Sequence, residues 1–174
     1  DELNGGGIVT TVMSNLGLEI YLNSKGLKLC RTHVGDRYVL EYMRQHGFNL
    51  GGEQSGHIIL SDYASTGDGI IAALQILSIA LTEGKPISDV TCLFEPVPQL
   101  LRNIKVKDAS NFDDTILRSI TETAEKQIGK MGRVLIRKSG TEEVIRVMVE
   151  SEDEVLMLKL VDDINSKLLE CEAK

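Results

Sequence analysis

The chain has 174 residues, of which 42% are hydrophobic and 26% are charged, a balance typical of one globular domain or two small ones. A net charge of −7 without a Lys/Arg block argues against nucleic-acid binding, because phosphate neutralisation needs a clustered basic face. The most apolar stretch, residues 69–81, is too short to cross a bilayer, so no membrane partner is expected.

The cysteines are three in number, Cys30, Cys92 and Cys171, and no two of them form a C-x-x-C pair. This spacing disfavours a zinc site or a disulfide framework and favours a reducing compartment. No signal peptide opens the sequence, so a cytoplasmic location is expected. The sequence also begins without Met, so we expect a piece of a longer protein.

The first half alternates short strand-like segments with amphipathic ones, the pattern of an α/β domain, which we expect to span residues 1–93. Ser14 is the expected N-cap of the first helix, and Thr66 or Asp68 that of the third. The third helix is apolar almost all round, which predicts burial on most sides. The expected elements are strand 7–13, helix 14–26, strand 27–34, helix 35–47, strand 56–60 and helix 69–83.

Two of the three prolines lie in residues 94–101, which we expect to link two domains. Residues 102–174 then have the pattern of a small α+β domain, with an antiparallel hairpin covered by two helices. Ser151 and Glu154 have the spacing of a capping box for the last helix. The expected elements are strand 100–107, helix 112–128, strand 133–137, strand 144–150 and helix 152–170.

One polar loop, GGEQSGH at residues 51–57, lies between a predicted helix and a predicted strand. Its glycines permit close backbone approach and positive φ. Glu53 accepts hydrogen bonds, Ser55 donates or accepts, and His57 does either according to its tautomer. This inventory suits a polyhydroxylated ligand. The alternative is a structural pair of Glu53 and His57 within a tight loop.

A second polar loop joins the two hairpin strands and has the sequence RKSGTEEVIR at residues 137–146. It contains a guanidinium fork, an ammonium group, two hydroxyls and a glycine that allows backbone N–H groups to converge, all of which suit a phosphate monoester. The residues with these groups are Arg137, Lys138, Ser139, Thr141 and Gly140. A solvated hairpin turn is the alternative. Arg146 either extends along apolar surface or points at the same anion.

A third loop has the sequence THVGDRYV at residues 32–39, where Gly35 follows a predicted strand and precedes a predicted helix. Helix N-termini at such positions attract anions. Asp36 would repel a phosphate, and capping the helix is its alternative role. His33 and Arg37 fit a structural role better than a catalytic one.

Five segments taken together resemble, in order, the C-terminal part of the bacterial phosphoglucosamine mutases of the α-D-phosphohexomutase superfamily: VMSNLGLE, VGDRYVLE, GGEQSGHII, TGDG and RKSGTEEVIRVMVE. The resemblance runs along essentially the whole chain, and five ordered motifs are specific where each alone is weak. The Glu-Gln-Ser-Gly-His form of the first loop favours the glucosamine branch over the phosphomannomutase/phosphoglucomutase branch, which is the alternative.

The resemblance implies a four-domain enzyme, with most of the third domain, an α/β domain with a mixed sheet, and all of the fourth, a small α+β domain, in this chain. The positions that match the family's grip on the sugar are Gly35, Glu53, Ser55 and His57. The positions that match its loop for the non-transferring phosphate are Arg137, Ser139, Gly140 and Thr141. Arg37, Lys138 and Arg146 are candidate supporting residues.

The family's usual R-P-S-G-T-E-P has Lys138 and Glu143 in place of both prolines here, so the loop is expected to be more flexible before ligand binds. The family's catalytic phosphoserine and Asp-rich Mg²⁺ loop belong to its first two domains, and the sequence contains neither motif. We therefore expect no catalytic residue and no metal ligand in this chain.

For the full-length enzyme, the resemblance implies an isomerase that interconverts glucosamine 6-phosphate and glucosamine 1-phosphate through a bisphosphate, for cell-wall precursor synthesis. It implies Mg²⁺, a hexose bisphosphate activator, a phosphosugar substrate and the enzyme's missing N-terminal domains as partners. A phosphosugar-binding module without catalysis is the alternative from another class.

Overall fold

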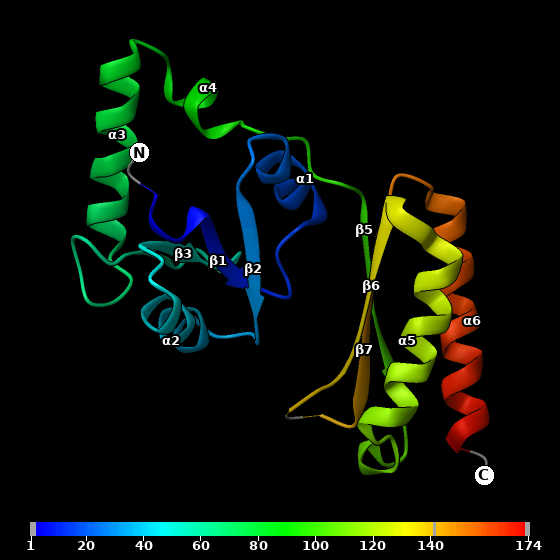
Figure 1. The fold of residues 1–174 in the computed structure, drawn as a ribbon. Helices are drawn as coiled ribbons and strands as arrows, with labels where there is room; N and C mark the ends of the chain where they lie inside the picture. Colours follow the sequence, from blue (N-terminus) through cyan, green and yellow to red (C-terminus); the bar gives the residue numbers. More distant parts are fainter. Residues whose placement is uncertain (1–2, 141, 173–174) are drawn as a thin grey trace. The chain divides into compact units, whose positions relative to one another are not determined.

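A computed structural model describes residues 3–140 and 142–172, with only the backbone of Met131. The chain divides into two compact units, residues 1–96 and residues 97–174 (Figure 1). Among the described residues, no helix combines the length and apolar character that a membrane span requires.

The first unit is built on a four-stranded sheet in the order β2-β1-β3-β4. Its strands are β1 (Gly7–Thr11), β2 (Lys28–Thr32), β3 (Leu50–Gly52) and β4 (Ile58–Leu60). β1 runs parallel to both β2 and β3, whereas β4 pairs antiparallel with β3. The expected mixed sheet of an α/β domain is therefore confirmed.

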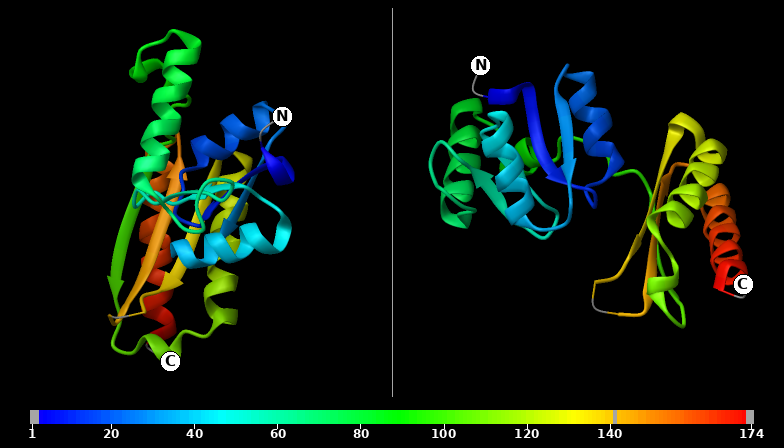
Figure 2. Two further views of the ribbon diagram at one scale, coloured as in Figure 1. Left: turned by 90° about the vertical axis from the view of Figure 1, so that its left-hand side faces the viewer. Right: turned by 60° about the horizontal axis from the view of Figure 1, so that its bottom comes forward.

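The helices of the first unit lie on both sides of this sheet. They are α1 (Leu16–Ser24), α2 (Asp36–His46), α3 (Gly69–Glu83) and α4 (Ile87–Thr91), and a 3-10 turn, η1 (Asn4–Gly6), precedes β1. Because β2 and β3 flank β1 on opposite sides, right-handed crossovers place α1 and α2 on opposite faces. Figures 1 and 2 show α3 on the same side as α1.

Packing between α2 and the sheet forms the core of the first unit. Val39 and Met43 of α2 are buried against Val9 and Ile59. A Cβ atom at Gly51 would lie 2.5 Å from Met43 Sδ and 2.7 Å from Val39 Cγ1. Gly51 therefore lets the helix approach the strand, which is a packing role that the sequence did not reveal.

The second unit is a three-stranded antiparallel sheet with two helices on one face, as expected for the small α+β domain (Figure 2). The strand order is β5-β7-β6. The elements are β5 (Gln99–Lys105), η2 (Ala109–Asn111), α5 (Asp114–Ile128), η3 (Gly129–Met131), β6 (Gly132–Lys138), β7 (Val144–Ser151) and α6 (Glu154–Glu172). Buried residues of β7, among them Ile145 and Val147, share one core with both helices.

Several boundaries differ from the sequence-based expectation. β3 lies inside the stretch expected to be loop, because its three residues include two glycines and give no strand pattern. β5 begins at Gln99, within the expected linker. Asn15 caps α1 instead of Ser14, since Asn15 Oδ1 accepts a 2.8 Å bond from the Gly17 N–H. Asp68 is confirmed as the N-cap of α3.

The start of α6 is also capped differently. Asp153 Oδ1 accepts from the Leu156 N–H at 2.9 Å, so Asp153 has the role predicted for Ser151. Ser151 Oγ instead accepts from the Asp153 N–H at 3.1 Å. Ser151 is still within β7, whose ladder holds its backbone extended and shifts the cap two residues along the chain.

The predicted burial of α3 is wrong for the described chain. Ala72 and Ala80 are buried, but Ile70, Leu74, Leu77 and Leu81 are between 44 and 83% exposed. Ile71 and Ile76 are half-buried, so the helix is covered along one side only. The apolar composition of the helix therefore did not predict which of its side chains are buried.

Candidate functional site

The glycine-rich loop, residues 51–57, begins in β3 and makes the tight connection to β4 through residues 53–57. The Glu53 N–H donates to the His57 carbonyl at 2.9 Å, and the Gly56 N–H donates to the Glu53 carbonyl at 3.0 Å. Gly56 has φ 99°, a conformation that side chains disfavour, so this turn requires glycine. The closed turn holds the side chains of Glu53, Ser55 and His57 near one another.

Glu53 is the anchor of this loop. Its side chain is only 10% exposed, and its Oε1 lies 3.5 Å from His57 Nδ1. Its Oε2 accepts from the Gly35 N–H at 3.3 Å. Ser55 Oγ lies 3.0 Å from the same His57 nitrogen, and the His57 side chain is 55% exposed. The structure thus brings together the four predicted sugar-binding residues, with a buried carboxylate beneath an accessible imidazole and hydroxyl.

Gly35 reaches this loop because it occupies the N-cap position of α2. Its φ of 131° favours glycine, and this conformation directs its N–H at Glu53. Asp36, the alternative cap, instead accepts from the Arg37 N–H at 2.8 Å. The exposed Arg37 guanidinium donates to Glu41 Oε1 at 2.9 Å, and the bond and charge of Glu41 raise the pKa of Arg37. The Arg37 side chain therefore pairs with Glu41 on α2 and makes no contact with the glycine-rich loop among the described hydrogen bonds and ion pairs.

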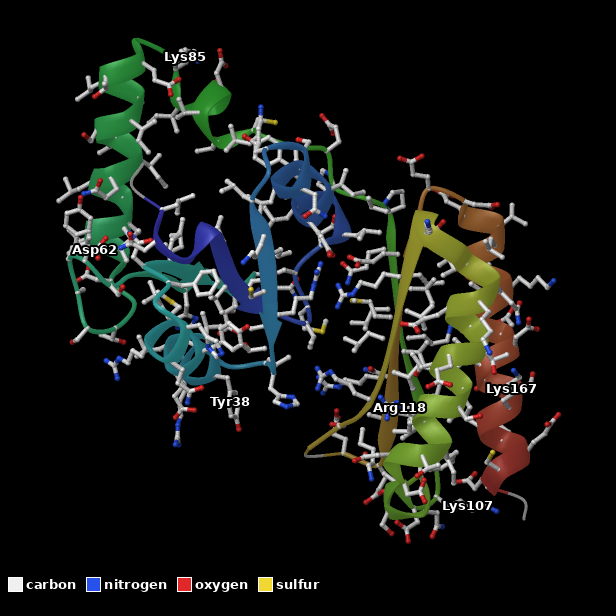
Figure 3. All side chains as sticks on the ribbon, in the orientation of Figure 1. Tyr38, Asp62, Lys85, Lys107, Arg118 and Lys167 are labelled. Atoms are coloured by element: carbon white, nitrogen blue, oxygen red, sulfur yellow. The ribbon has the colours of Figure 1, made fainter. Side chains whose placement is uncertain are left out.

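His33 lies beside α2 and contacts a side chain of that helix. His33 contacts the Tyr38 ring edge-on, with ring centres 5.8 Å apart. Tyr38 points outward from the first turns of α2 (Figure 3). The structural interpretation of His33 therefore fits this contact.

A groove of about 440 Å³ begins at the glycine-rich loop and extends over the sheet. Its polar lining residues are Glu53, Gln54 and His57 of the loop, and Thr10, Ser14 and Asn15 of β1 and the segment after it. Gln54 was not singled out in the sequence analysis, although it stands between two residues that were. The other lining residues are apolar side chains or glycines.

In the second unit, two arginines face each other across the hairpin that carries the predicted phosphate loop. Arg137 of β6 is directly opposite Arg146 of β7. Burial lowers the pKa of Arg137, and the positive charge of Arg146 lowers it further. Within residues 3–140 and 142–172, no carboxylate forms an ion pair with Arg137.

Arg146 is only partly satisfied. Its Nη2 lies 3.4 Å from Glu142 Oε2. Its Nε is buried, and the part of the chain that the structure describes provides no hydrogen-bond partner for it. Two opposed guanidinium groups with little compensating charge form a local excess of positive charge suited to an anion. The sequence left the orientation of Arg146 open, and only strand register placed it beside Arg137.

The loop between these strands is closed at both ends. The Ser139 N–H donates to the Val144 carbonyl at 3.0 Å. Glu143 accepts twice from the segment that follows β5, through its carbonyl from the Val106 N–H at 3.1 Å and through Oε2 from the Ala109 N–H at 2.6 Å. Glu143 thus ties the loop down at one of the positions where the family's proline is replaced.

Other residues of the predicted phosphate loop are placed differently. Gly140 is exposed and does not adopt a left-handed φ. Lys138 alternates with Arg137 along β6 and therefore points to the opposite sheet face. Thr141 lies outside the described residues. Among the described residues, no cluster of three His, Cys, Asp or Glu side chains could hold a metal ion.

The α/β unit with its mixed sheet, followed by a small antiparallel α+β unit, defines a class of protein. Residues 1–97 match the family model of phosphoglucomutase/phosphomannomutase, alpha/beta/alpha domain III. Residues 97–167 match the phosphoglucomutase/phosphomannomutase C-terminal domain. The chain belongs to this family.

Within the family, the chain is similar to phosphoglucosamine mutases, as its motifs had indicated. It is 57% identical to that of Brucella anthropi over 94% of its length, and 56% identical to that of Parvibaculum lavamentivorans over 93%. It spans 36% of the length of each of these relatives.

Solved structures support the fold. An Aspergillus fumigatus N-acetylphosphoglucosamine mutase has a TM-score of 0.80 at 19% identity, covering 97% of this chain and 39% of that chain. The same enzyme in complex with GlcNAc-6P and magnesium has a TM-score of 0.77 at 18% identity, covering 95% of this chain and 42% of that chain.

Proposed function

We propose that this chain is the substrate-binding C-terminal part of a phosphoglucosamine mutase. The whole protein would be an isomerase that interconverts glucosamine 6-phosphate and glucosamine 1-phosphate through a bisphosphate intermediate. The observation that carries this proposal is 57% identity to a phosphoglucosamine mutase over 94% of the chain. The arrangement of the glycine-rich loop and of the paired arginines supports it.

The glycine-rich loop would hold the sugar ring. Each oxygen of an ionised carboxylate has two lone pairs, so Glu53 can accept from sugar hydroxyls while it keeps its contacts with Gly35 and His57. Ser55 and His57 lie beside it at the surface and can exchange hydrogen bonds with neighbouring hydroxyls. Because a buried anchor fixes their positions, binding would require little rearrangement.

The hairpin of the second unit would hold the phosphate that is not transferred. Arg137 would provide a bidentate fork, and the opposed Arg146 would provide its unsatisfied Nε–H and a second positive charge. A phosphate dianion between them would remove the like-charge repulsion. Ser139, Gly140 and Thr141 would add hydroxyl and backbone donors, and Lys138 would contribute longer-range attraction only.

Phosphoryl transfer itself would take place on groups outside this chain. We propose Mg²⁺ and a hexose bisphosphate for the whole protein, because related structures contain GlcNAc-6P with magnesium or glucose 1,6-bisphosphate. By the resemblance, the Asp-rich loop that would hold Mg²⁺ belongs to the domains of the whole protein outside this chain. The role of this chain would therefore be to bind and orient the phosphosugar, in the cytoplasm.

The test is to compare turnover of glucosamine, mannose and glucose phosphates by the longer protein that contains residues 1–174. We expect glucosamine 6-phosphate to have the highest kcat/KM, and the 174-residue chain alone to show no turnover. Higher kcat/KM for mannose or glucose phosphates would assign the protein to the other branch. Turnover by the purified 174-residue chain would overturn the proposal that phosphoryl transfer takes place on groups outside it.

A further inference from the structure

The paired arginines of the second unit lie on the sheet face opposite to α5 and α6. Ile145 of β7 belongs to the core that both helices cover. Because side chains alternate along a strand, the neighbouring Arg146 points to the other face, together with the residues directly opposite it on the two flanking strands. These residues are Arg137 of β6 and Asn103 of β5. Arg146 is therefore the middle of a row that crosses all three strands and ends at Asn103.

The next row on this face has the same construction. The Ser139 N–H donates to the Val144 carbonyl at 3.0 Å, so Ser139 lies beside Val144. On the other side of Val144, β5 places Lys105 directly opposite. Each row thus has a residue of the predicted phosphate loop on one side and a polar residue of β5 on the other. Neighbouring strands are about 4.7–4.9 Å apart, so an anion held above β7 is within reach of side chains from both sides.

Positive charge on this face exceeds the negative charge beside it. Among the described residues, Glu142 is the only carboxylate that forms an ion pair with Arg137, Arg146 or Lys105, at 3.4 Å from Arg146 Nη2. Three cations beside one carboxylate suit a phosphate dianion, although the whole chain has a net charge of −7. The Asn103 side chain is exposed and forms no hydrogen bond within the part of the chain that the structure describes, so its amide N–H groups are available.

The two β5 residues have an alternative role as ordinary surface residues. Lysine is common on edge strands such as β5, where its charge discourages pairing with another chain, and an exposed asparagine can bond to water. That role does not require either residue to lie opposite Arg146 or in the same row as Ser139. It also leaves the buried Arg146 Nε–H without a partner among the described residues.

We propose that the phosphate subsite extends across the sheet to β5, where Asn103 donates an amide N–H to the phosphate and Lys105 provides a third positive charge. This inference rests on the phosphosugar function proposed above. Arg137 and Asn103 contact the anion from opposite sides of β7, with Arg146 beneath it. The fork of Arg137 and the amide of Asn103 fix the direction of the phosphate, whereas Lys105 acts as a point charge.

The first test measures the dissociation constant of inorganic phosphate for the 174-residue chain by amide NMR. Asn103→Ala should raise it about tenfold, because a hydrogen bond to a charged group is lost. Asn103→Asp should raise it further, because a carboxylate repels the phosphate. Lys105→Met should raise it about threefold, and high salt should reduce this effect but not that of Asn103→Ala.

Arg102→Met is the matched control. Arg102 is a cation on the same strand, but it points to the opposite face, where its Nη1 lies 2.6 Å from Asp162 Oδ1. Its replacement should leave the dissociation constant for phosphate unchanged. Weaker binding by this variant, equal to that of Lys105→Met, would show an effect of net charge alone and would overturn the role of Lys105.

Kinetics of the longer protein give a second readout. Asn103→Ala should raise KM for glucosamine 6-phosphate about tenfold with kcat nearly unchanged, because the phosphate that is not transferred is bound equally in the ground state and the transition state. The melting temperature without ligand should stay the same, since the side chain is exposed. A lower melting temperature with unaltered KM would assign Asn103 a structural role and overturn the inference.

Two outcomes separate this inference from the function on which it rests. Suppose that phosphate shifts the amides of Arg137 and Arg146 and that Asn103→Ala and Lys105→Met bind it as tightly as wild type. The extension to β5 is then overturned, and the proposed function stands. If phosphate shifts neither amide in the wild-type chain, the proposed phosphate subsite is itself overturned, and this inference with it.

Discussion

Replacing Arg146 by Met tests whether the second unit holds two arginines together for an anion. Like charges at directly opposed strand positions, as for Arg137 and Arg146, cost about 0.2–1 kcal/mol. Among the described residues Arg146 Nε lacks a partner, and a buried donor in that state costs about 1–3 kcal/mol. The variant loses a 3.4 Å contact with Glu142, worth at most about 1 kcal/mol.

The net result should be a rise of about 1 kcal/mol in the free energy of unfolding of the second unit without phosphate. For a unit of this size, that is an increase of about 4–8 °C in its melting temperature. The pKa of Arg137 should rise towards its usual value, because one of the two causes that lower it is removed. Methionine retains the unbranched length of the stem and can pack beside Met148 on the same sheet face.

The wild-type protein and the Arg146→Met variant should then differ in how much phosphate stabilises them. At ten times its dissociation constant, phosphate should stabilise the wild-type unit by about 1.4 kcal/mol and the variant by much less. The assay is calorimetry with and without phosphate, with the transition assigned through amide signals of β7. Arg118→Met is the control, since Arg118 lies on α5 with 81% of its side chain exposed (Figure 3). Destabilisation by Arg146→Met, or an unchanged phosphate response, would refute the reasoning.

In the longer protein, His57→Ala should lower kcat/KM for the phosphosugar, and the loss should correspond to about 1–3 kcal/mol in activation free energy. Because this side chain is exposed, the melting temperature should not change. Unaltered kinetics would return His57 to a structural role. Glu143→Ala should destabilise the second unit by about 1 kcal/mol, because the Ala109 N–H loses its acceptor. Hydrogen exchange at the Ala109 N–H should become faster. Unchanged exchange at that amide would count against the anchoring role of Glu143. Gly51→Ala should cost about 1–3 kcal/mol in chemical denaturation, because the new methyl meets Met43 Sδ; a neutral effect would show that α2 moves away without cost.

The sequence by itself determined the elements that depend on local pattern. The alternation of strands and helices, the antiparallel hairpin of the second unit and the Asp68 cap all follow from periodicity and capping chemistry within a few residues. The two polar loops were also visible, because their donors and acceptors are close together in the sequence. The family followed from five such segments in order.

Only the tertiary structure decided which distant residues meet. Strand register brought Arg146 opposite Arg137 and sent Lys138 to the other face. The approach of α2 required Gly51, which the sequence had grouped with the glycines of a ligand loop. The apolar pattern of α3 predicted burial on most sides, but only Ala72 and Ala80 are buried. Which side chains of a helix are covered depends on its neighbours in space, and those are set by the packing of the whole chain.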